Sequence, residues 1–203
     1  DTCDWVGTSM GGLIAYTGFA TGVLAKRINR LILNDIGPKL SDDGLKRIFV
    51  YTQKYPEFDR YSEFEEYYRK LVPDLCGTDP AFQRRTFEAY CRRLPDGKFK
   101  AHYDPAIIEV IRKALMPTEE ELAKAPPKPD VWALWKLVTC DVLVIRGGNS
   151  DLLLPEYVDK MQAEKEGSKV CELHTVPGVG HAPTLCSAEE LSVISKFFEG
   201  KKE

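Results

Sequence analysis

A serine between two glycines, near the start of the chain, constrains the fold more than any other feature. Residues 7–11 read G-T-S-M-G, with an apolar run before them and a helix-forming run after them. Where a strand turns sharply into a helix, a serine at the apex adopts a strained backbone conformation and its hydroxyl projects clear of the main chain. We expect Ser9 to occupy such an apex. Glycine at Gly7 and Gly11 should let the strand and the helix pass closely.

The segments on either side of this turn predict a strand, a helix and a second strand. The helix should run from Met10 to Ala20 and be closed by Gly22. The apolar run from Arg30 to Ile36, which a Gly-Pro pair ends, is typical of a buried parallel strand. A strand, a helix and a parallel strand in succession form a right-handed crossover unit. The opening of the chain therefore indicates an α/β architecture.

The composition excludes several kinds of partner. The 203 residues are 43% hydrophobic and carry a net charge of -3, without the basic excess that would favour nucleic acid or a membrane surface. No apolar run approaches the roughly 20 residues that span a membrane. The six cysteines are scattered, with no C-x-x-C pair and no metal-ligand spacing, which favours reduced thiols in a cytoplasmic protein. We expect neither a metal nor a cofactor.

The middle of the chain has the pattern of a helical insertion. From Pro38 to about residue 138 there is no strong strand signal, and aromatic residues recur at helical spacing. Amphipathic helices are predicted at residues 42–55, 62–71, 79–93, 104–115 and 130–137. We therefore expect a helical insertion over residues 38–138. The core should then combine residues 1–37 with residues 139–203.

The last third of the chain returns to alternating strands and helices. Strands are predicted at residues 141–146 and 169–176, and helices at residues 155–166 and 187–198, the second of which opens on an S-x-x-E capping box. Asp151 follows the first of these strands and His181 follows the second. Polar groups at the carboxyl ends of parallel strands meet at one edge of the sheet. Ser9, Asp151 and His181 should therefore lie together.

Three motifs together resemble the α/β-hydrolase superfamily, in the branch with a serine nucleophile and an inserted helical cap. They are the G-x-S-x-G turn with the further glycine at position 12, the strand and loop over residues 142–151, and the G-V-G-H-A-P loop over residues 178–183. The order Ser, Asp, His matches the order of the catalytic groups in that superfamily. The resemblance implies the C-terminal part of an α/β-hydrolase fold, a parallel sheet flanked by helices with a helical cap.

The resemblance also implies a role for each group. Ser9 would be the nucleophile and His181 the base that takes its proton and later protonates the leaving group. Asp151 would hold the tautomer of His181 and stabilise the imidazolium. The backbone N–H of Met10 would be one donor of the oxyanion hole. The turn at residues 7–11 corresponds to the nucleophile elbow of the superfamily. Some members take the acid from the strand after this elbow, which makes Asp35 the alternative acid.

Neither of the other histidines fits the role of base as well. His102 lies among predicted helices of the insertion, and His174 lies inside a predicted strand. Only His181 lies in a glycine-rich loop beyond a strand.

The function that the resemblance implies is a serine hydrolase acting through an acyl-enzyme on a small carboxylic ester. A serine at the elbow argues against haloalkane dehalogenase and epoxide hydrolase chemistry, which use aspartate there. Two alternatives stay open. One is hydrolysis of a carbon–carbon bond in a diketone-type ring-cleavage product, and the other is a non-catalytic fragment or ligand-binding module of the same fold.

By the same resemblance, several strands and helices precede the elbow in a complete hydrolase, together with a His-Gly turn that supplies another oxyanion donor. No such turn occurs in this sequence. We therefore expect the C-terminal part of a larger protein, poorly active or inactive by itself. The elbow strand should present an unpaired apolar edge. A dimer or a complementary chain would cover it, and a small molecule would be the substrate.

Overall fold

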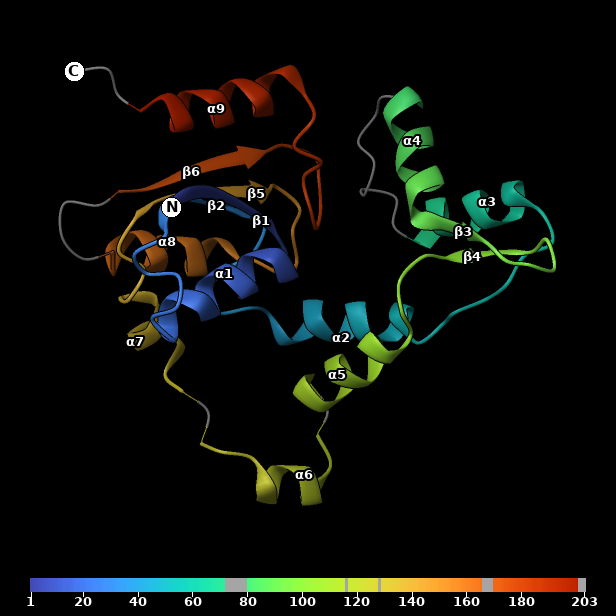
Figure 1. Cartoon of the computed structure of the whole chain (residues 1–203), viewed down its shortest axis with the longest axis horizontal. Coiled ribbons are helices and arrows are strands. Elements are labelled where there is room, and N and C mark those ends of the chain that lie inside the picture. Colours follow the sequence, from blue (N-terminus) through green and yellow to red (C-terminus); the bar gives the residue numbers. More distant parts are fainter. Residues whose placement is uncertain (72–79, 116, 128, 166–169, 201–203) are drawn as a thin grey trace. The chain divides into compact units, whose positions relative to one another are not determined.

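The computed structural model of the protein describes residues 1–71, 80–115, 117–127, 129–165 and 170–200 (Figure 1). The chain divides into two compact units. The core unit consists of Asp1–Asp42 and Lys128–Glu203, and the helical unit consists of Asp43–Pro127. No helix among the described residues is long and apolar enough to cross a membrane.

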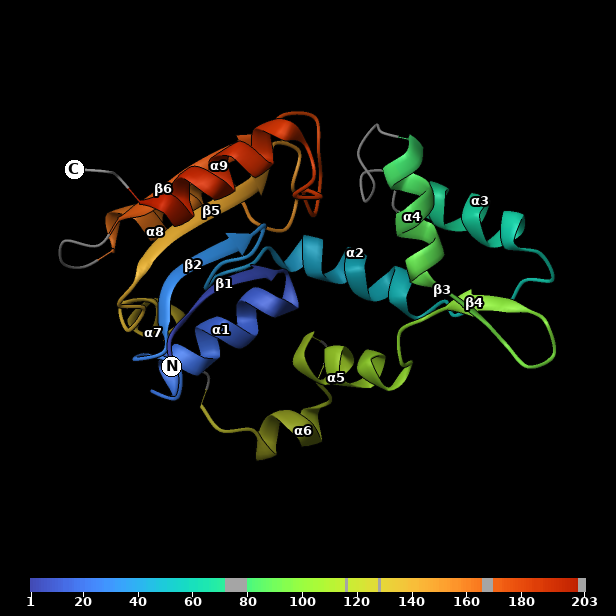
Figure 2. The ribbon, with the colours of Figure 1, turned by 45° about the horizontal axis from the view of Figure 1, so that its top comes forward.

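The core unit contains a sheet of four parallel strands in the order β1-β2-β5-β6. Its helices lie on both faces, with α9 on one and α1, α7 and α8 on the other (Figures 1 and 2). This arrangement confirms the α/β fold expected from the sequence. The elements of the core unit are β1 (Cys3–Thr8), α1 (Met10–Ala20), β2 (Ile28–Asn34), α7 (Val131–Trp135), β5 (Asp141–Gly147), α8 (Pro155–Ala163), β6 (Cys171–Val176) and α9 (Ala188–Glu199).

The two central strands carry the hydrophobic core because both of their faces are covered. In β2 and β5, Ile32 is paired with Leu143, and both side chains pack against Phe197 of α9. Alternate residues of a strand point to opposite faces. Leu33 and Val144, the next pair in the register, therefore face the other layer and are equally buried. A continuous apolar run is what a strand covered on both faces requires.

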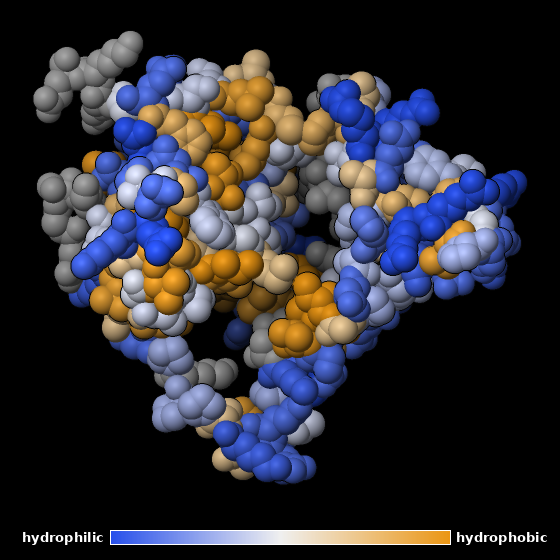
Figure 3. All heavy atoms as spheres, viewed as in Figure 1, coloured by the Kyte–Doolittle hydropathy of each residue, from blue (hydrophilic) through white to orange (hydrophobic). Residues whose placement is uncertain are grey.

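The strand β1 is less protected. It pairs with β2 and forms one edge of the described sheet, and its side chains are mostly exposed. Val6 is 45% exposed, and Met10 and Ile14 of the following helix are more than half exposed. In Figure 3, hydrophobic atoms reach the surface of the core unit over α1 and around α9 and β6.

The helical unit is built around an aromatic cluster. Phe64, Tyr68 and Phe87 are buried at its centre, and further tyrosines and phenylalanines pack around them. Most pairs of rings are tilted or edge-to-face, as aromatic side chains favour, and Tyr61 and Phe64 are stacked. The elements of this unit are α2 (Asp42–Thr52), α3 (Tyr61–Leu71), α4 (Pro80–Tyr90), β3 (Cys91–Arg93), β4 (Phe99–Ala101), α5 (Ala106–Leu115) and α6 (Glu119–Lys124).

The hairpin β3–β4 differs from the expectation of helices and loops alone. The helix expected to reach residue 93 ends at Tyr90, and Cys91 then pairs with Ala101 in an antiparallel ladder. The strands turn at Asp96 and Gly97, where Gly97 has a φ of 92°. Three-residue strands are too short for a period of two to be recognised in the sequence.

The boundary of the helical unit also differs from the expected residues 38–138, because α7 belongs to the core unit. Trp135 is fully buried, and its Nε1 donates to the carbonyl of Met161 in α8 at 2.9 Å. The hydroxyl of Tyr16 in α1 donates to the carbonyl of Val131. These two bonds attach α7 to α1 and to α8, the other two helices on its face of the sheet.

Several predicted elements are found close to their expected limits. The helix α1 has the predicted bounds, and Gly22 follows it with a φ of 75°. Ser187 and Glu190 form the expected capping box of α9. The expected helix cap at Asp79 and the strand start at Lys169 lie outside the described residues. So does Cys76, while the other five cysteines are free thiols.

Candidate active site

Four chain segments meet at the carboxyl edge of the sheet. Ser9 follows β1, Asp35 follows β2, the loop 148–154 follows β5, and His181 lies beyond β6. Because these strands are parallel and adjacent, their carboxyl ends lie side by side. Groups separated by up to 172 residues in the sequence therefore come within hydrogen-bonding distance.

The turn at Ser9 has the strained geometry that the G-x-S-x-G pattern predicts. Ser9 has a φ of 49° and a ψ of -116°, a conformation that residues with a side chain rarely adopt. Gly7 permits the turn, because a Cβ there would lie 2.5 Å from the backbone nitrogen of Gly12. At Gly11 a Cβ would meet nothing within 4 Å, whereas at Gly12 it would lie 2.3 Å from Ile36. The close-packed glycine of the helix is thus Gly12, not Gly11 as expected.

The helix α1 begins directly after the serine. Its first residue is Met10, and the carbonyl of Ser9 accepts hydrogen bonds from the backbone of Gly12 and Leu13. The N–H of a first helical residue has no acceptor within its own helix. The Met10 N–H is therefore free of intrahelical bonding, and its part in an oxyanion hole stays a prediction.

Ser9, His181 and Asp35 form a continuous chain of hydrogen bonds. The Nε2 of His181 lies 3.1 Å from the Oγ of Ser9, and its Nδ1 lies 2.7 Å from the Oδ2 of Asp35. Asp35 is fully buried and the His181 side chain is 9% exposed. A carboxylate can only accept, so Nδ1 donates to it and the lone pair of Nε2 faces the serine hydroxyl. This is the arrangement in which an imidazole can take a proton from a serine.

The carboxylate that meets His181 in the structure is that of Asp35, not that of Asp151 as expected. Asp35 comes directly after β2, the strand next to β1, and the His181 ring meets it there. Asp151 lies four residues beyond the end of β5 and is partly exposed. Its loop supplies a hydrogen-bond donor to Asp35, the hydroxyl of Ser150. Asp35 also has a φ of 52°, which directs the chain out of the strand at this position.

Two donors, one from the last residue of β5 and one from the loop after it, hold the carboxylate of Asp35. The backbone N–H of Gly147 donates to Oδ1 at 3.0 Å, and the hydroxyl of Ser150 donates to Oδ2 at 2.6 Å. The Ser150 oxygen in turn accepts the backbone N–H groups of Leu152 and Leu153. Both oxygens of the buried carboxylate therefore have a hydrogen-bond donor. Ser150 could not be identified from the sequence, because a serine in a loop carries no pattern of its own.

Close backbone packing positions the His181 loop. A Cβ at Gly147 would lie 2.2 Å from the carbonyl oxygen of Gly180, the residue before the histidine. The backbone N–H of Asn149 donates to the carbonyl of Val179 at 2.8 Å. The side chain of Arg146 donates to the carbonyls of Leu153 and Ser150, which braces the opposing loop. Glycine at 147 is therefore required for the approach of His181.

The remaining histidines lie elsewhere. His102 is exposed in the helical unit, next to β4. His174 is a residue of β6, paired in register with Ile145. Among the described residues, no group of three or more His, Cys, Asp or Glu side chains is arranged to hold a metal ion.

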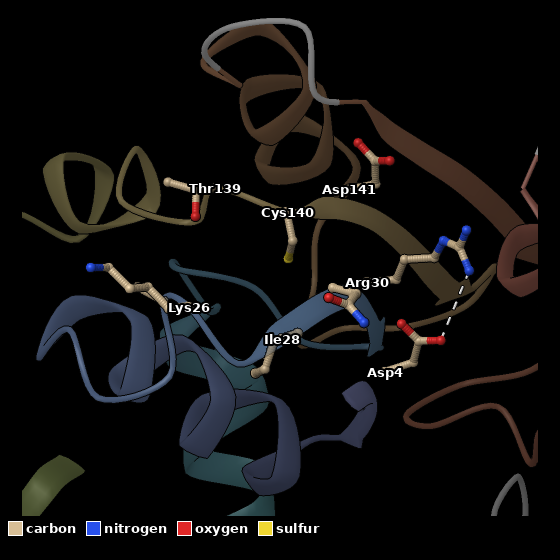
Figure 4. A pocket seen from close by; sticks show the side chains of 9 residues that line it. Asp4, Lys26, Ile28, Arg30, Thr139, Cys140 and Asp141 are labelled. Atoms are coloured by element: carbon tan, nitrogen blue, oxygen red, sulfur yellow. Dashed lines mark ion pairs between the residues drawn. The ribbon is translucent and has the colours of Figure 1, made fainter. Parts of the chain in front are cut away.

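A polar pocket at the opposite end of the sheet contains none of these groups. It is lined by the amino ends of β1, β2 and β5, where Asp4 and Arg30 form an ion pair at 3.9 Å (Figure 4). In the same view, the ammonium of Lys26 points away from that pair. The charged groups of this pocket do not converge on one point, whereas Ser9, His181 and Asp35 do. The candidate active site is therefore the one at the carboxyl edge of the sheet.

The fold and the geometry at Ser9 agree with the comparison to known families. The chain belongs to the alpha/beta hydrolase family, whose model matches residues 1–192. This confirms the resemblance drawn from the three sequence motifs.

Individual relatives are longer than the part of them that this chain matches. The 3-hydroxybutyrate-oligomer hydrolase of Cupriavidus necator is 34% identical over 200 residues, which cover 97% of this chain and 65% of that protein. A crystal structure of an alpha/beta hydrolase from Novosphingobium aromaticivorans is 30% identical, with a TM-score of 0.75, and the match covers 96% of this chain and 64% of that one. A Rickettsia typhi structure is 25% identical, with a TM-score of 0.81, over 100% of this chain and 64% of that one. The chain thus spans a little less than two thirds of these relatives.

Proposed function

We propose that this chain carries the catalytic groups of a serine hydrolase that cleaves carboxylic esters through an acyl-enzyme. The observation that supports it most strongly is the chain of hydrogen bonds from Ser9 through His181 to Asp35. A serine hydroxyl is a weak nucleophile unless a base takes its proton. His181 is placed to do so, and the buried carboxylate of Asp35 holds the imidazole in the required tautomer.

The proposed reaction uses the same groups twice. The Oγ of Ser9 attacks the ester carbonyl while its proton passes to Nε2 of His181, and the oxyanion forms beside the N–H of Met10. Collapse of this intermediate breaks the bond to the alcohol, which leaves with the proton from His181. A water molecule then gives a proton to His181 and attacks the acyl group on Ser9. The second collapse releases the acid and returns the proton to the serine.

Ester oligomers of short hydroxy acids are the substrates that we propose to test first. The relative from Cupriavidus necator is a 3-hydroxybutyrate-oligomer hydrolase, and its match covers nearly all of this chain. Each bond of such an oligomer is a carboxylic ester, the bond that an activated serine cleaves.

Covalent labelling tests the serine mechanism directly. A fluorophosphonate should form an adduct at Ser9 of the full-length protein, located by mass spectrometry of peptides. Ser9→Ala should abolish both the adduct and turnover of a 3-hydroxybutyrate dimer, because the nucleophile is absent. Ser62→Ala is the matched control, since Ser62 is an exposed serine of α3, and it should label like wild type. Absence of an adduct at Ser9 in the wild-type protein would support a non-catalytic module instead.

The substrate class is decided by a competition. We expect turnover of a short acyl ester to exceed turnover of a vinylogous diketone at equal concentration. Preferential cleavage of the diketone would assign carbon–carbon bond hydrolysis, which uses the same serine, histidine and aspartate.

A further inference from the structure

Asn34 is a buried amide that connects three parts of the candidate site. It is the last residue of β2, it is fully buried, and it pairs in register with Thr8 of β1. Its Nδ2 donates to the Oγ1 of Thr8 at 3.0 Å and to the carbonyl of Pro183 at 2.8 Å. Its own carbonyl accepts the backbone N–H of Ser9 at 3.1 Å.

The chemistry of these partners determines which way the amide points. A proline carbonyl can only accept a hydrogen bond, so the nitrogen of Asn34 has to face Pro183. The amide oxygen, Oδ1, is then buried without a partner among the described residues. Leaving a buried acceptor unpaired is unfavourable, and an apolar side chain of similar volume would avoid it. What asparagine supplies here, and an apolar side chain would not, are the two donor bonds to Thr8 and Pro183.

We infer that Asn34 is a positioning residue that keeps the nucleophile, the acid and the base in register, an inference that rests on the proposed function. Asn34 holds the strand end that carries Ser9 on one side. It is the residue directly before Asp35. On the other side it holds Pro183, two residues beyond His181. One amide thus restrains the position of the imidazole relative to the hydroxyl that it serves.

The test is the variant Asn34→Leu in the full-length protein. Both side-chain hydrogen bonds are lost while the volume is nearly kept. We expect kcat for a 3-hydroxybutyrate dimer, and the rate of fluorophosphonate labelling at Ser9, to fall about tenfold to a hundredfold, because small misplacements of catalytic groups cost that much. KM should stay within about twofold, since no substrate contact is removed.

Asn29→Leu is the matched control. Asn29 lies at the other end of β2, is exposed, and donates to the hydroxyl of Thr2 as Asn34 does to Thr8. It should leave kcat unchanged. If Asn34→Leu lowers the melting temperature but labels Ser9 at the wild-type rate, Asn34 has only a structural role and the inference is overturned. Absence of labelling in the wild type would instead overturn the proposed function.

Thr8→Val provides a second route should Asn34→Leu not fold. It removes one acceptor of the amide and keeps the shape of the side chain. A fall of several-fold in kcat, with an unchanged melting temperature, is expected. An unchanged kcat in this variant would overturn the inference.

Discussion

At the scale of single residues, the site depends on how one buried carboxylate is satisfied. Asp35 is inaccessible to solvent and accepts three hydrogen bonds, from Gly147, Ser150 and His181. A buried charge is stable only when it is paired and bonded in this way. When His181 becomes an imidazolium, the same carboxylate stabilises the new positive charge.

Replacing this carboxylate should remove most of the activity. We expect Asp35→Asn in the full-length protein to lower kcat by about 10⁴-fold, since an amide can hold the imidazole in the wrong tautomer. The measurement is steady-state turnover of a short ester at pH 7.

Asp151→Asn makes the same chemical change after the neighbouring strand. It should retain activity within about threefold of wild type, because the hydrogen bonds from Ser9 through His181 to Asp35 stay in place. The opposite ranking of the two variants would show that Asp151 is the acid in solution.

The sequence could identify Ser9 and His181 as candidates but could not separate the two aspartates. Each aspartate follows a predicted strand, and strand ends meet at one edge whichever strand is considered. What distinguishes them is the order of strands in the sheet and the donors of Ser150 and Gly147. Both depend on contacts across more than 100 residues, which no local pattern records.

At the scale of elements, the start of α9 is fixed by a buried carboxylate. Glu190 accepts the backbone N–H groups of Leu185 and Ser187, while the Ser187 hydroxyl accepts the N–H of Glu190. Burial raises the pKa of Glu190, but the hydrogen bonds from Ser187, Leu185 and Cys186 outweigh it and lower the pKa below the ordinary value of 4.5. The ionised form is therefore the one that the fold stabilises.

This lowered pKa predicts how stability depends on pH. A group whose pKa is lowered by folding contributes stability above its unfolded value, here about 4.5, and loses it as the pH falls through the folded value. Glu190→Gln should cost about 1 kcal/mol at pH 7. The difference from wild type should shrink below about pH 4, as measured by urea unfolding at a series of pH values.

Glu189→Gln is the control for this experiment. Glu189 occupies the same first turn but is exposed. It should change the unfolding free energy by less than about 0.5 kcal/mol. An equal loss of unfolding free energy in both variants, independent of pH, would mean that the hydrogen bonds of the capping box do not lower the pKa of Glu190.

Long periodic elements could be predicted from the sequence, and short ones could not. The apolar run of β5 and the S-x-x-E start of α9 have strong local signals, and both elements are present. The hairpin of β3 and β4 has strands of three residues, rich in charge, and its pairing depends on the aromatic cluster of the helical unit. Helix α7 was expected, but its place in the core unit depends on Trp135 reaching α8.

At the scale of the whole molecule, β1 carries the nucleophile on an edge of the described sheet. Its exposed backbone edge and the half-exposed Val6 form a surface on which another strand can pair. We predict that the isolated 203-residue chain associates in a concentration-dependent way through this edge. Size-exclusion chromatography with light scattering measures the effect.

A charge on the edge should oppose that association. Val6→Lys is expected to shift the chain toward the monomer, because lysine on an edge strand disfavours pairing. Val110→Lys, at a more exposed position of α5, should leave the distribution as it is. A wild-type chain that is monomeric at every concentration would contradict the prediction.

The strand order has a consequence for when the chemistry begins. Ser9 and Asp35 are brought together by a short crossover, but His181 lies 172 residues beyond the serine, in the loop after β6. Without that loop the serine is an ordinary alcohol without a base. We therefore expect that a nascent chain in which residue 181 has not yet been synthesised cannot attack an ester.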